Sequence, residues 1–315
     1  MSTRSLRILG WAVAVAIGAA LVWGWIGWSR PHTPLVDFQK VAPTPTAPPA
    51  GTEQPTLRVA ISAIISPGTT RTYYDELLKL IGTKLGRRVE FFQRKSYAEV
   101  NDLLEKREVD LAFVCSGPYV LGHAKFGMEI VAVPVVNGET VYYSYLIARK
   151  TGPIESFDDL KGRKFAFTDP DSNTGCLVPR FMLAQRGVKP ENFFRETFFT
   201  HSHDNSVKAV ASGLADGAAV DSLIWEFMNA TDPTFTDQTR IVLKSPSYGI
   251  PPVVVHPALD ATLKQNLKAL LLTLHTDATA RSLLQHLRIE RFTEGNDEMY
   301  QSVREMQDWL AKPSE

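Results

Sequence analysis

Residues 165–175 read FAFTDPDSNTG, and this stretch passes from a short apolar strand into hydroxyl and amide side chains where a helix should begin. The first N–H groups of a helix have no partners inside it and carry the positive end of its dipole. Ser172, Asn173 and Thr174 would add side-chain donors, and Gly175 lets the backbone come close. The stretch predicts either an oxyanion seat or an ordinary helix cap, because these residue types serve both.

Strands and helices alternate on both sides of this stretch. The hydrophobic periodicity predicts strands over residues 57–61, 88–93, 109–114, 164–167, 197–200 and 217–220. It predicts helices between them, over residues 74–85, 97–106, from 118, 176–186 and 205–214. Alternation of this kind is typical of α/β folds with parallel strand pairing.

A short repeat indicates two related lobes. Residues 110–116 (DLAFVCS) and 216–222 (DGAAVDS) share the pattern Asp-x-Ala-x-Val-x-Ser after an amphipathic helix. The β-rich segments 141–148 and 241–255 would cross between the lobes. We therefore expect lobe 1 over about 56–147 and 250–315 and lobe 2 over about 148–249, with a ligand cleft at the carboxyl ends of the strands.

The N-terminal segment has the composition of a membrane span. Residues 8–28 carry no charge, with Arg4 and Arg7 before them and Arg30 after them. This length predicts an uncleaved anchor within residues 1–30 rather than a cleaved signal, and the arginines place the following chain outside the membrane. Residues 31–55 are rich in Pro and predict a semi-rigid linker, although a remnant without function is the alternative.

The composition restricts the partners. The chain has 34 basic and 34 acidic residues, so its formal charge of zero gives no support for nucleic-acid binding. Its two cysteines, Cys115 and Cys176, are too few for a disulfide scaffold and lack zinc-site spacing. They could form one bridge, but we expect free buried thiols.

Several motifs occur together in the same order as in a known family. They are residues 169–175 (DPDSNTG), 200–205 (THSHDN) and 219–225 (AVDSLIW), with Tyr97 in SYAEV, Asp110, the segment 116–119 (SGPY) and Tyr142 before SYLI. In these motifs the chain resembles the phosphate-, phosphite- and phosphonate-binding proteins of ABC importers, over about residue 57 to the C-terminal region. The resemblance implies a type II periplasmic-binding fold with two crossover strands.

The resemblance also implies which residues bind the ligand. The matching positions are Tyr97, Tyr142, Ser172, Asn173, Thr174, His203 and Asp221. Asn173 stands where Ser or Thr is expected, so the preferred anion could differ from that of the typical transport protein. The implied function is capture of a small phosphorus oxyanion on the periplasmic side of the inner membrane for an ABC permease and ATPase, without catalysis, cofactor or metal.

Each of these residues also has a structural alternative. We expect His203 to be cationic when it binds an anion, and Asp221 to select protonated anions unless it only caps a helix. Core packing competes with ligand contact for Tyr97 and Tyr142. A module that senses the ligand for a kinase or cyclase is the main functional alternative. A Ser172-His203-Asp221 hydrolase or a metal site at residues 201–204 is a weaker one.

Overall fold

The computed structural model describes residues 54–312. The expected membrane anchor and most of the Pro-rich linker lie outside these residues. Within residues 54–312, no helix combines the length and the hydrophobicity that crossing a bilayer requires.

The strands follow the predicted alternation closely. Their bounds are β1 (Thr56–Ile61), β2 (Arg88–Gln93), β3 (Leu111–Phe113), β4 (Glu129–Val135), β5 (Val141–Tyr142), β6 (Ser144–Arg149), β7 (Lys164–Phe167), β8 (Glu196–Phe199), β9 (Gly217–Asp221), β10 (Thr239–Lys244), β11 (Tyr248–Gly249), β12 (Val253–Val255) and β13 (Arg291–Thr293). All six predicted strands are present, and two of them, β2 and β7, have the predicted bounds.

The helices connect these strands. They are α2 (Pro67–Leu85), α3 (Tyr97–Glu105), α4 (Ser116–Phe126), α5 (Val178–Ala184), α6 (Pro190–Phe193), α7 (His203–Ala211), α8 (Ser222–Thr231), α9 (Ala261–Thr273), α10 (Ala278–His286) and α11 (Gln301–Ala311). Short 3₁₀ turns occur at Asp158–Leu160, Thr236–Gln238, Leu274–Thr276 and Asp297–Tyr300. The helix predicted from residue 176 instead begins with a π-helical turn at Asn173–Leu177 and continues as α5.

Two sheets with equivalent strand arrangements form the two lobes. The first has the order β13-β4-β12-β3-β1-β2 and the second β10-β6-β9-β7-β8. In each, the strand next to one edge pairs in parallel with both neighbours: β1 with β2 and β3, and β7 with β8 and β9. Antiparallel strands complete each sheet, with β12 beside β3 and β6 beside β9. The sheets are mixed rather than purely parallel, because the chain crosses between the lobes and returns.

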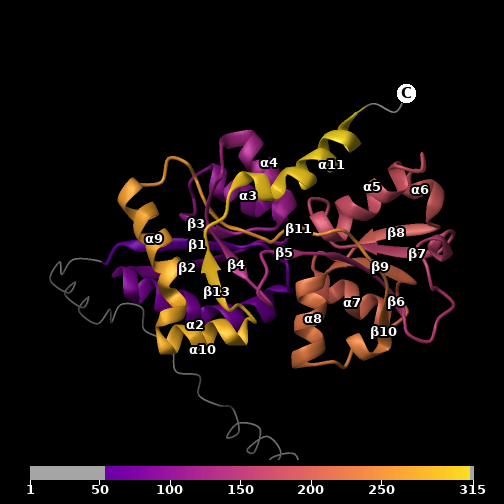
Figure 1. Ribbon diagram of the computed structural model, residues 1–315, viewed down its shortest axis with the longest axis horizontal. Coiled ribbons are helices and arrows are strands. Elements are labelled where there is room, and N and C mark those ends of the chain that lie inside the picture. Colours follow the sequence, from indigo (N-terminus) through magenta and orange to yellow (C-terminus); the bar gives the residue numbers. More distant parts are fainter. Residues whose placement is uncertain (1–53, 313–315) are drawn as a thin grey trace, which may run out of the picture. The chain divides into compact units, whose positions relative to one another are not determined.

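The crossings are confirmed as a pair of adjacent strands. β5 and β11 pair antiparallel with Tyr248 opposite Tyr142, and Figure 1 shows them running between the lobes. The chain enters the second sheet at Ser144 and leaves it at Lys244, so β6 belongs to the second lobe although we expected residues up to 147 in the first. The chain enters the second lobe before residue 147 because the crossing strand β5 has only two residues.

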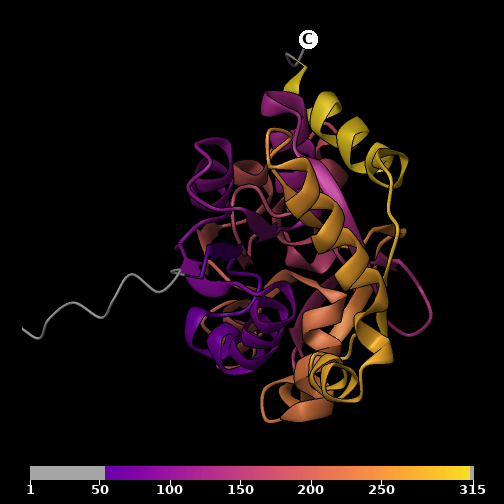
Figure 2. The ribbon, with the colours of Figure 1, turned by 90° about the vertical axis from the view of Figure 1, so that its left-hand side faces the viewer.

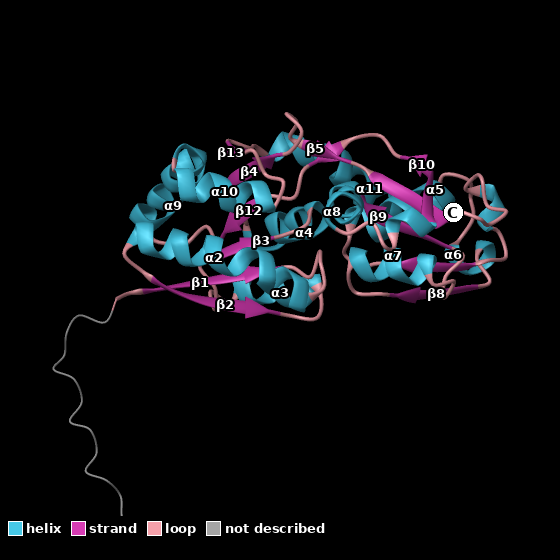
Figure 3. Ribbon diagram, turned by 90° about the horizontal axis from the view of Figure 1, so that it is seen from below, coloured by secondary structure: helices cyan, strands magenta, loops and turns pink. Residues whose placement is uncertain are grey.

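Helices cover both faces of each sheet (Figures 1 and 3). In the first lobe, α2, α9 and α10 pack on one face and α3, α4 and α11 on the other. Figure 2 shows α9, in orange, and α11, in yellow, running along the outside of this lobe. In the second lobe, α5 and α6 cover one face, and α7 and α8 the other. This layering brings the carboxyl ends of β1, β3, β7 and β9 to the boundary between the lobes.

The repeated motif performs the same structural task in both lobes. The Asp110 N–H donates to the Arg58 carbonyl and Asp110 Oδ2 accepts from the Arg58 N–H, both at 2.8 Å. Asp216 makes the same two bonds to Lys164, both at 2.9 Å. Each aspartate therefore fixes the strand of its motif to its parallel neighbour, β1 in the first lobe and β7 in the second.

Candidate functional site

The turn after β7 is built around Ser172. Ser172 Oγ accepts from the Gly175 N–H at 3.0 Å, and its carbonyl accepts from the N–H groups of Cys176 and Leu177 at 3.1 and 2.9 Å. The bond to Leu177 spans five residues, which widens the first turn into a π-helix, a form often found at functional sites. The side chains of Asn173 and Thr174 lie on this turn and are buried.

Gly175 lets this turn lie directly against His203. A Cβ at position 175 would lie 2.4 Å from Thr168 Oγ1 and 3.0 Å from His203 Cε1. Ser172 Oγ lies 3.4 Å from His203 Nε2. The turn and the imidazole therefore face each other, as the sequence predicts.

His203 is neutral, which corrects the expectation of a cationic imidazole. Its Nδ1 accepts a hydrogen bond from the Asp221 backbone N–H at 3.0 Å, so the ring proton sits on Nε2. Burial lowers the pKa of His203 to about 3. The neutral ring still offers the Nε2 proton to an anion on the side of Ser172. The geometry is not that of a hydrolase triad, because Nδ1 meets the backbone of Asp221 and not its carboxylate.

Asp221 both caps a helix and keeps a free oxygen. Oδ1 accepts from the Leu223 N–H at 2.7 Å at the start of α8, whereas Oδ2 is buried without a hydrogen-bond partner among the described residues. Burial raises the pKa of Asp221 to about 7. The carboxyl group is therefore held near its point of protonation, and its free oxygen is available to a ligand.

The first lobe and the crossing supply two phenols. Tyr142 OH accepts from Asn173 Nδ2 at 3.1 Å and lies 3.6 Å from Cys115 Sγ, whereas Tyr97 OH is buried without a partner. Burial raises the pKa of both phenols well above the ordinary value, so both keep their protons. The adjacent Tyr143 points to the other side of the chain, where Lys244 lies over its ring. Tyr142 is therefore the tyrosine of this segment that enters the site. Both Cys115 and Cys176 are free thiols.

All seven predicted residues are fully buried. Contacts join Ser172 to His203, His203 to the backbone of Asp221, and Asn173 to Tyr142, so these residues lie in one region between the lobes. The atoms without hydrogen-bond partners in this region are Ser62 Oγ, Tyr97 OH, Asn173 Oδ1, Thr174 Oγ1 and Asp221 Oδ2. A buried polar group left unpaired costs about 1–3 kcal/mol. Several of them together indicate a site that is completed by a polar ligand. We call these five residues, with Ser172, His203 and Tyr142, the polar seat.

Two residues at the site were not predicted from the sequence: Ser62, whose Oγ is unpaired, and Cys115, whose Sγ lies 3.6 Å from Tyr142 OH. Ser62 follows β1 directly, and Cys115 caps α4 after β3. In the repeated motif Cys115 occupies the position of the predicted Asp221, whereas Ser62 follows β1 as Thr168, which was not predicted either, follows β7. Their place at the carboxyl end of parallel strands was the available signal.

Helix starts converge on the polar seat. Tyr97 is the first residue of α3, Asn173 of the π-helical turn and His203 of α7, while Asp221 caps α8. Each helix start contributes the positive end of a dipole. No residue of the polar seat is Lys or Arg, so helix dipoles and neutral donors would stabilise a bound anion there.

The two lobes are in contact around the polar seat. The His203 N–H donates to the Ile64 carbonyl at 3.0 Å, and the N–H and Oγ of Ser66 donate to the Asp204 carboxylate at 2.8 and 2.7 Å. Tyr73 of α2 meets Phe227 of α8 edge to face, with ring centroids 4.9 Å apart. These contacts indicate a closed arrangement that excludes bulk water from the polar seat.

Two α/β lobes joined by crossing strands, with a buried polar seat between them, define a two-lobed solute-binding protein. The model of the family described as "ABC transporter, phosphonate, periplasmic substrate-binding protein" matches residues 59–300. The chain therefore belongs to this family of periplasmic substrate-binding proteins.

Individual relatives agree with this assignment. The chain is 31% identical to the phosphate-import protein PhnD of Mycolicibacterium smegmatis, over 55% of this chain and 57% of that protein, which is less than two thirds of its length. It is 22% identical to the phosphonates-binding periplasmic protein of Escherichia coli, over 81% of this chain and 76% of that protein.

Solved structures share the fold. A binding component of a phosphonate ABC transporter from Pseudomonas aeruginosa aligns with a TM-score of 0.77 at 26% identity, over 81% of this chain and 86% of that chain. PhnD1 of Prochlorococcus marinus, solved with methylphosphonate, aligns with a TM-score of 0.75 at 20% identity, over 81% of this chain and 98% of that chain.

Proposed function

We propose that this chain captures a small phosphorus oxyanion between its lobes and presents it to the permease and ATPase of an ABC importer. The observation that supports this most directly is the set of unpaired buried atoms among the helix starts: Ser62 Oγ, Tyr97 OH, Asn173 Oδ1, Thr174 Oγ1 and Asp221 Oδ2. Both lobes supply these atoms, so a ligand that pairs with them stabilises the closed state. The chain acts by binding and release, not by catalysis.

In this proposal the donors hold the anionic oxygens. Ser172, Thr174, Tyr97, Tyr142 and the Nε2–H of His203 donate to the oxyanion. The amide of Asn173 can rotate to present either a donor or an acceptor. None of these contacts needs a cationic side chain, because the helix dipoles supply the positive potential.

Asp221 gives the site its selectivity. A carboxylate beside an anion is stable only when a proton lies between them, and Oδ2 has no other partner. Phosphate, phosphite and phosphonates can carry that proton near neutral pH, whereas sulfate cannot. Sulfate depends on the proton of Asp221 itself, whose pKa is about 7, so we infer that the site favours phosphorus oxyanions over sulfate at a pH above that value.

Calorimetric titration of the full chain in mild detergent tests this function. At pH 8, where Asp221 is mostly ionised, we expect heat of binding with at least one of phosphate, phosphite, methylphosphonate and 2-aminoethylphosphonate, and much weaker binding of sulfate. Thr174→Ala should weaken binding about tenfold through the lost donor, while Thr234→Ala on the surface should leave it unchanged. Silence with all four phosphorus compounds would reject the proposal.

We also propose that residues 1–30 anchor the protein in the inner membrane and that residues 31–55 act as a linker, which leaves the two lobes on the periplasmic side. The charge-free stretch 8–28 supports this proposal. Fractionation of cells that produce the full chain tests it: an anchored protein stays with the membranes after alkaline carbonate extraction and keeps its N-terminal sequence. A shortened N-terminus would contradict the anchor.

A further inference from the structure

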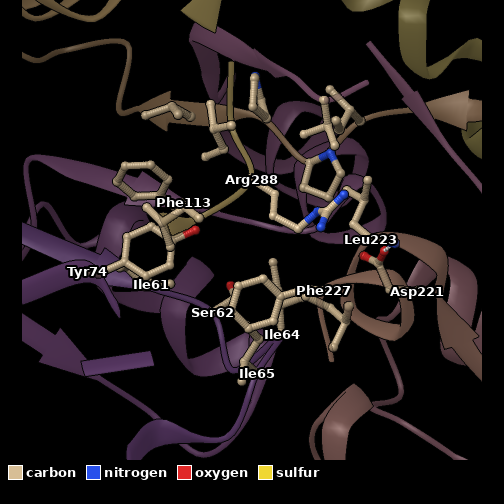
Figure 4. A pocket seen from close by; sticks show the side chains of 18 of the residues that line it. Ile61, Ser62, Ile64, Ile65, Tyr74, Phe113, Asp221, Leu223, Phe227 and Arg288 are labelled. Carbon is tan, nitrogen blue, oxygen red and sulfur yellow. Dashed lines mark hydrogen bonds between the residues drawn. The ribbon is translucent and has the colours of Figure 1, made fainter. Parts of the chain in front are cut away.

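A separate cavity lies between the lobes beside the polar seat. Its volume is about 110 Å³, and it is lined mainly by carbon-rich side chains from both lobes. Figure 4 shows Ile61, Ile64, Ile65 and Phe113 of the first lobe on its wall with Leu223 and Phe227 of the second. We call it the apolar chamber.

The apolar chamber shares two residues with the polar seat. Ser62 and Asp221 line its wall, and their Oγ and Oδ2 atoms are among those without partners. Figure 4 shows the Asp221 carboxyl group at one end of the chamber. A ligand oxygen that pairs with Asp221 therefore leaves the rest of its molecule next to the chamber.

Arg288 marks the side of the chamber that faces solvent. It lines both the apolar chamber and a second, more polar groove formed with Thr72, Tyr73 and Thr231. Its backbone φ is 58°, in the left-handed region that few residues other than glycine adopt. Figure 4 shows the Arg288 side chain reaching across the chamber toward Leu223. The chamber is therefore reached from solvent past this side chain.

We propose that the apolar chamber holds an organic substituent on the phosphorus atom, and that the preferred ligands are phosphonates with an alkyl or aryl group of about four to six carbons. This inference rests on the proposed function of the polar seat. An engineered apolar cavity of about 150 Å³ binds benzene, so the smaller chamber of about 110 Å³ suits a butyl group and has a phenyl group as its upper limit. Inorganic phosphate and phosphite would leave the chamber unfilled.

The ligand series follows from the chemistry of the wall. Each buried methylene should add about fourfold in affinity, so butylphosphonate should bind at least about tenfold more tightly than methylphosphonate. The charged residues of the lining are Asp221, Glu226 and Arg288, and Glu226 already accepts a hydrogen bond from Tyr145 OH. Propylphosphonate and 2-aminoethylphosphonate have nearly the same shape. The chamber should favour the propyl compound, because the ammonium group would lose its hydration among mainly apolar side chains and beside the Arg288 guanidinium.

Calorimetric titration of the full chain in mild detergent tests the series with phosphate and with methyl-, propyl-, butyl-, phenyl- and 2-aminoethylphosphonate. Affinity that rises with chain length supports the chamber. Methylphosphonate that binds as tightly as the butyl and phenyl compounds, or aminoethylphosphonate that binds more tightly than its propyl analogue, overturns it while leaving the proposed function intact. Silence from every compound instead rejects the proposed function.

A cavity-filling variant makes the test specific to the chamber. Ile65→Phe should reduce the affinity for phenylphosphonate at least tenfold and leave that for methylphosphonate unchanged. Ile241→Phe, the same substitution on the exposed face of β10, is the matched control and should change neither. If Ile65→Phe does not fold, Val136→Phe fills the chamber from another segment. A folded variant of either kind that keeps the full affinity for phenylphosphonate overturns the inference.

Discussion

At the scale of single residues, the polar seat depends on two buried titratable groups, His203 and Asp221. His203 is neutral, and Asp221 is partly protonated near pH 7. Burial disfavours the charged form of each, so it lowers the pKa of His203 and raises that of Asp221. The two side chains do not pair with each other, because the His203 Nδ1 takes the Asp221 backbone N–H. A neutral donor and a weakly acidic acceptor are thus presented to the ligand, which suits an anion that keeps one proton.

The first prediction concerns the pH dependence of affinity. The complex holds one proton between Asp221 and the anion, and the pKa of Asp221 is about 7. Affinity for methylphosphonate should therefore fall as the pH rises from about 7 to 9, approaching tenfold per unit. Calorimetry across this range measures it, with Asp221→Asn as the control that lacks this proton. An affinity that stays constant up to pH 9 in the unmodified protein would contradict the shared proton.

The second prediction concerns stability without ligand. A carboxyl group whose pKa is raised on folding makes the protein less stable as pH rises from its unfolded value of 3.8 to about 7. Asp221→Asn removes this penalty and keeps the helix cap, so its melting temperature at pH 8 should exceed that of the unmodified protein by about 5 °C.

The difference in melting temperature should shrink toward pH 4, where Asp221 carries its proton in both states. Differential scanning fluorimetry without ligand measures both points. An equal or lower melting temperature for Asp221→Asn at pH 8 would show that the buried carboxylate does not destabilise the folded protein.

The third prediction concerns the tautomer of His203. Because its folded pKa is about 3, His203 should remain neutral at pH 5 with its proton on Nε2. Stability that depends on this neutral form is fully present above about pH 6.5, and it is lost progressively as the pH falls from there to the folded pKa of about 3. Nitrogen-detected NMR of the folded chain reports the tautomer, and the chain unfolded in urea is the reference. Signals of a doubly protonated ring at pH 5 would contradict the assignment.

At the scale of elements, the helix starts and the close approach of the lobes position the polar seat. Gly117 in the first turn of α4 shows how tight this approach is: a Cβ there would lie 2.2 Å from the Asp171 carbonyl oxygen of the other lobe. The nearest atoms all belong to the second lobe. The absence of a side chain at position 117 is therefore required for closure rather than for the helix itself.

The fourth prediction follows from this contact. Gly117→Ala should fold normally but weaken binding of every ligand at least tenfold, because the added methyl group keeps the lobes apart. Small-angle scattering should then show no ligand-induced contraction. Gly68→Ala in the first turn of α2 is the matched control, since nothing lies within 4 Å of its added Cβ. Normal affinity in Gly117→Ala would show that the closed contact is not needed.

The sequence was sufficient to predict the strands and helices that have a clear hydrophobic periodicity of their own. Periodicity located strands such as β2 and β7 to the residue. It did not reveal β4, β13 or the mixed pairing, because antiparallel partners such as Val254 and Ile130 are far apart in the chain. The candidate residues could be collected from strand ends, but their protonation states depend on burial and on the contacts of neighbouring segments. For that reason His203 was expected to carry a charge that the fold does not allow.

At the scale of the whole molecule, the two lobes repeat one arrangement and share the crossings. The motif serines of the repeat bond to opposite crossing segments: Ser116 Oγ donates to the Gly249 carbonyl of β11 at 2.6 Å, and Ser222 Oγ accepts from the Tyr143 N–H beside β5 at 3.0 Å. Each lobe is thereby attached to a different crossing segment. Movement of the lobes is expected at the residues between these attachments.

The fifth prediction concerns the contacts that hold the closed state. Ser66→Ala removes the hydroxyl bond to Asp204 across the lobes, and Ser66 does not belong to the polar seat. Binding of phosphate and methylphosphonate should weaken equally, by about tenfold, through faster release. Stopped-flow measurement of dissociation checks this, with the exposed Ser302→Ala as control. A loss confined to one ligand would mean that Ser66 acts through the site instead.

The edge-to-face pair of Tyr73 and Phe227 offers a practical use of lobe closure. The two rings come from α2 and α8, whereas α11 lies on the other side of the sheets, against α4 and α5 (Figure 1). A solvatochromic dye on Tyr73→Cys would pass from water into contact with an aromatic ring when the lobes meet. A protein attached to a chip through a tag after α11 would keep that face free, and it would become an optical sensor for organophosphorus compounds in water samples.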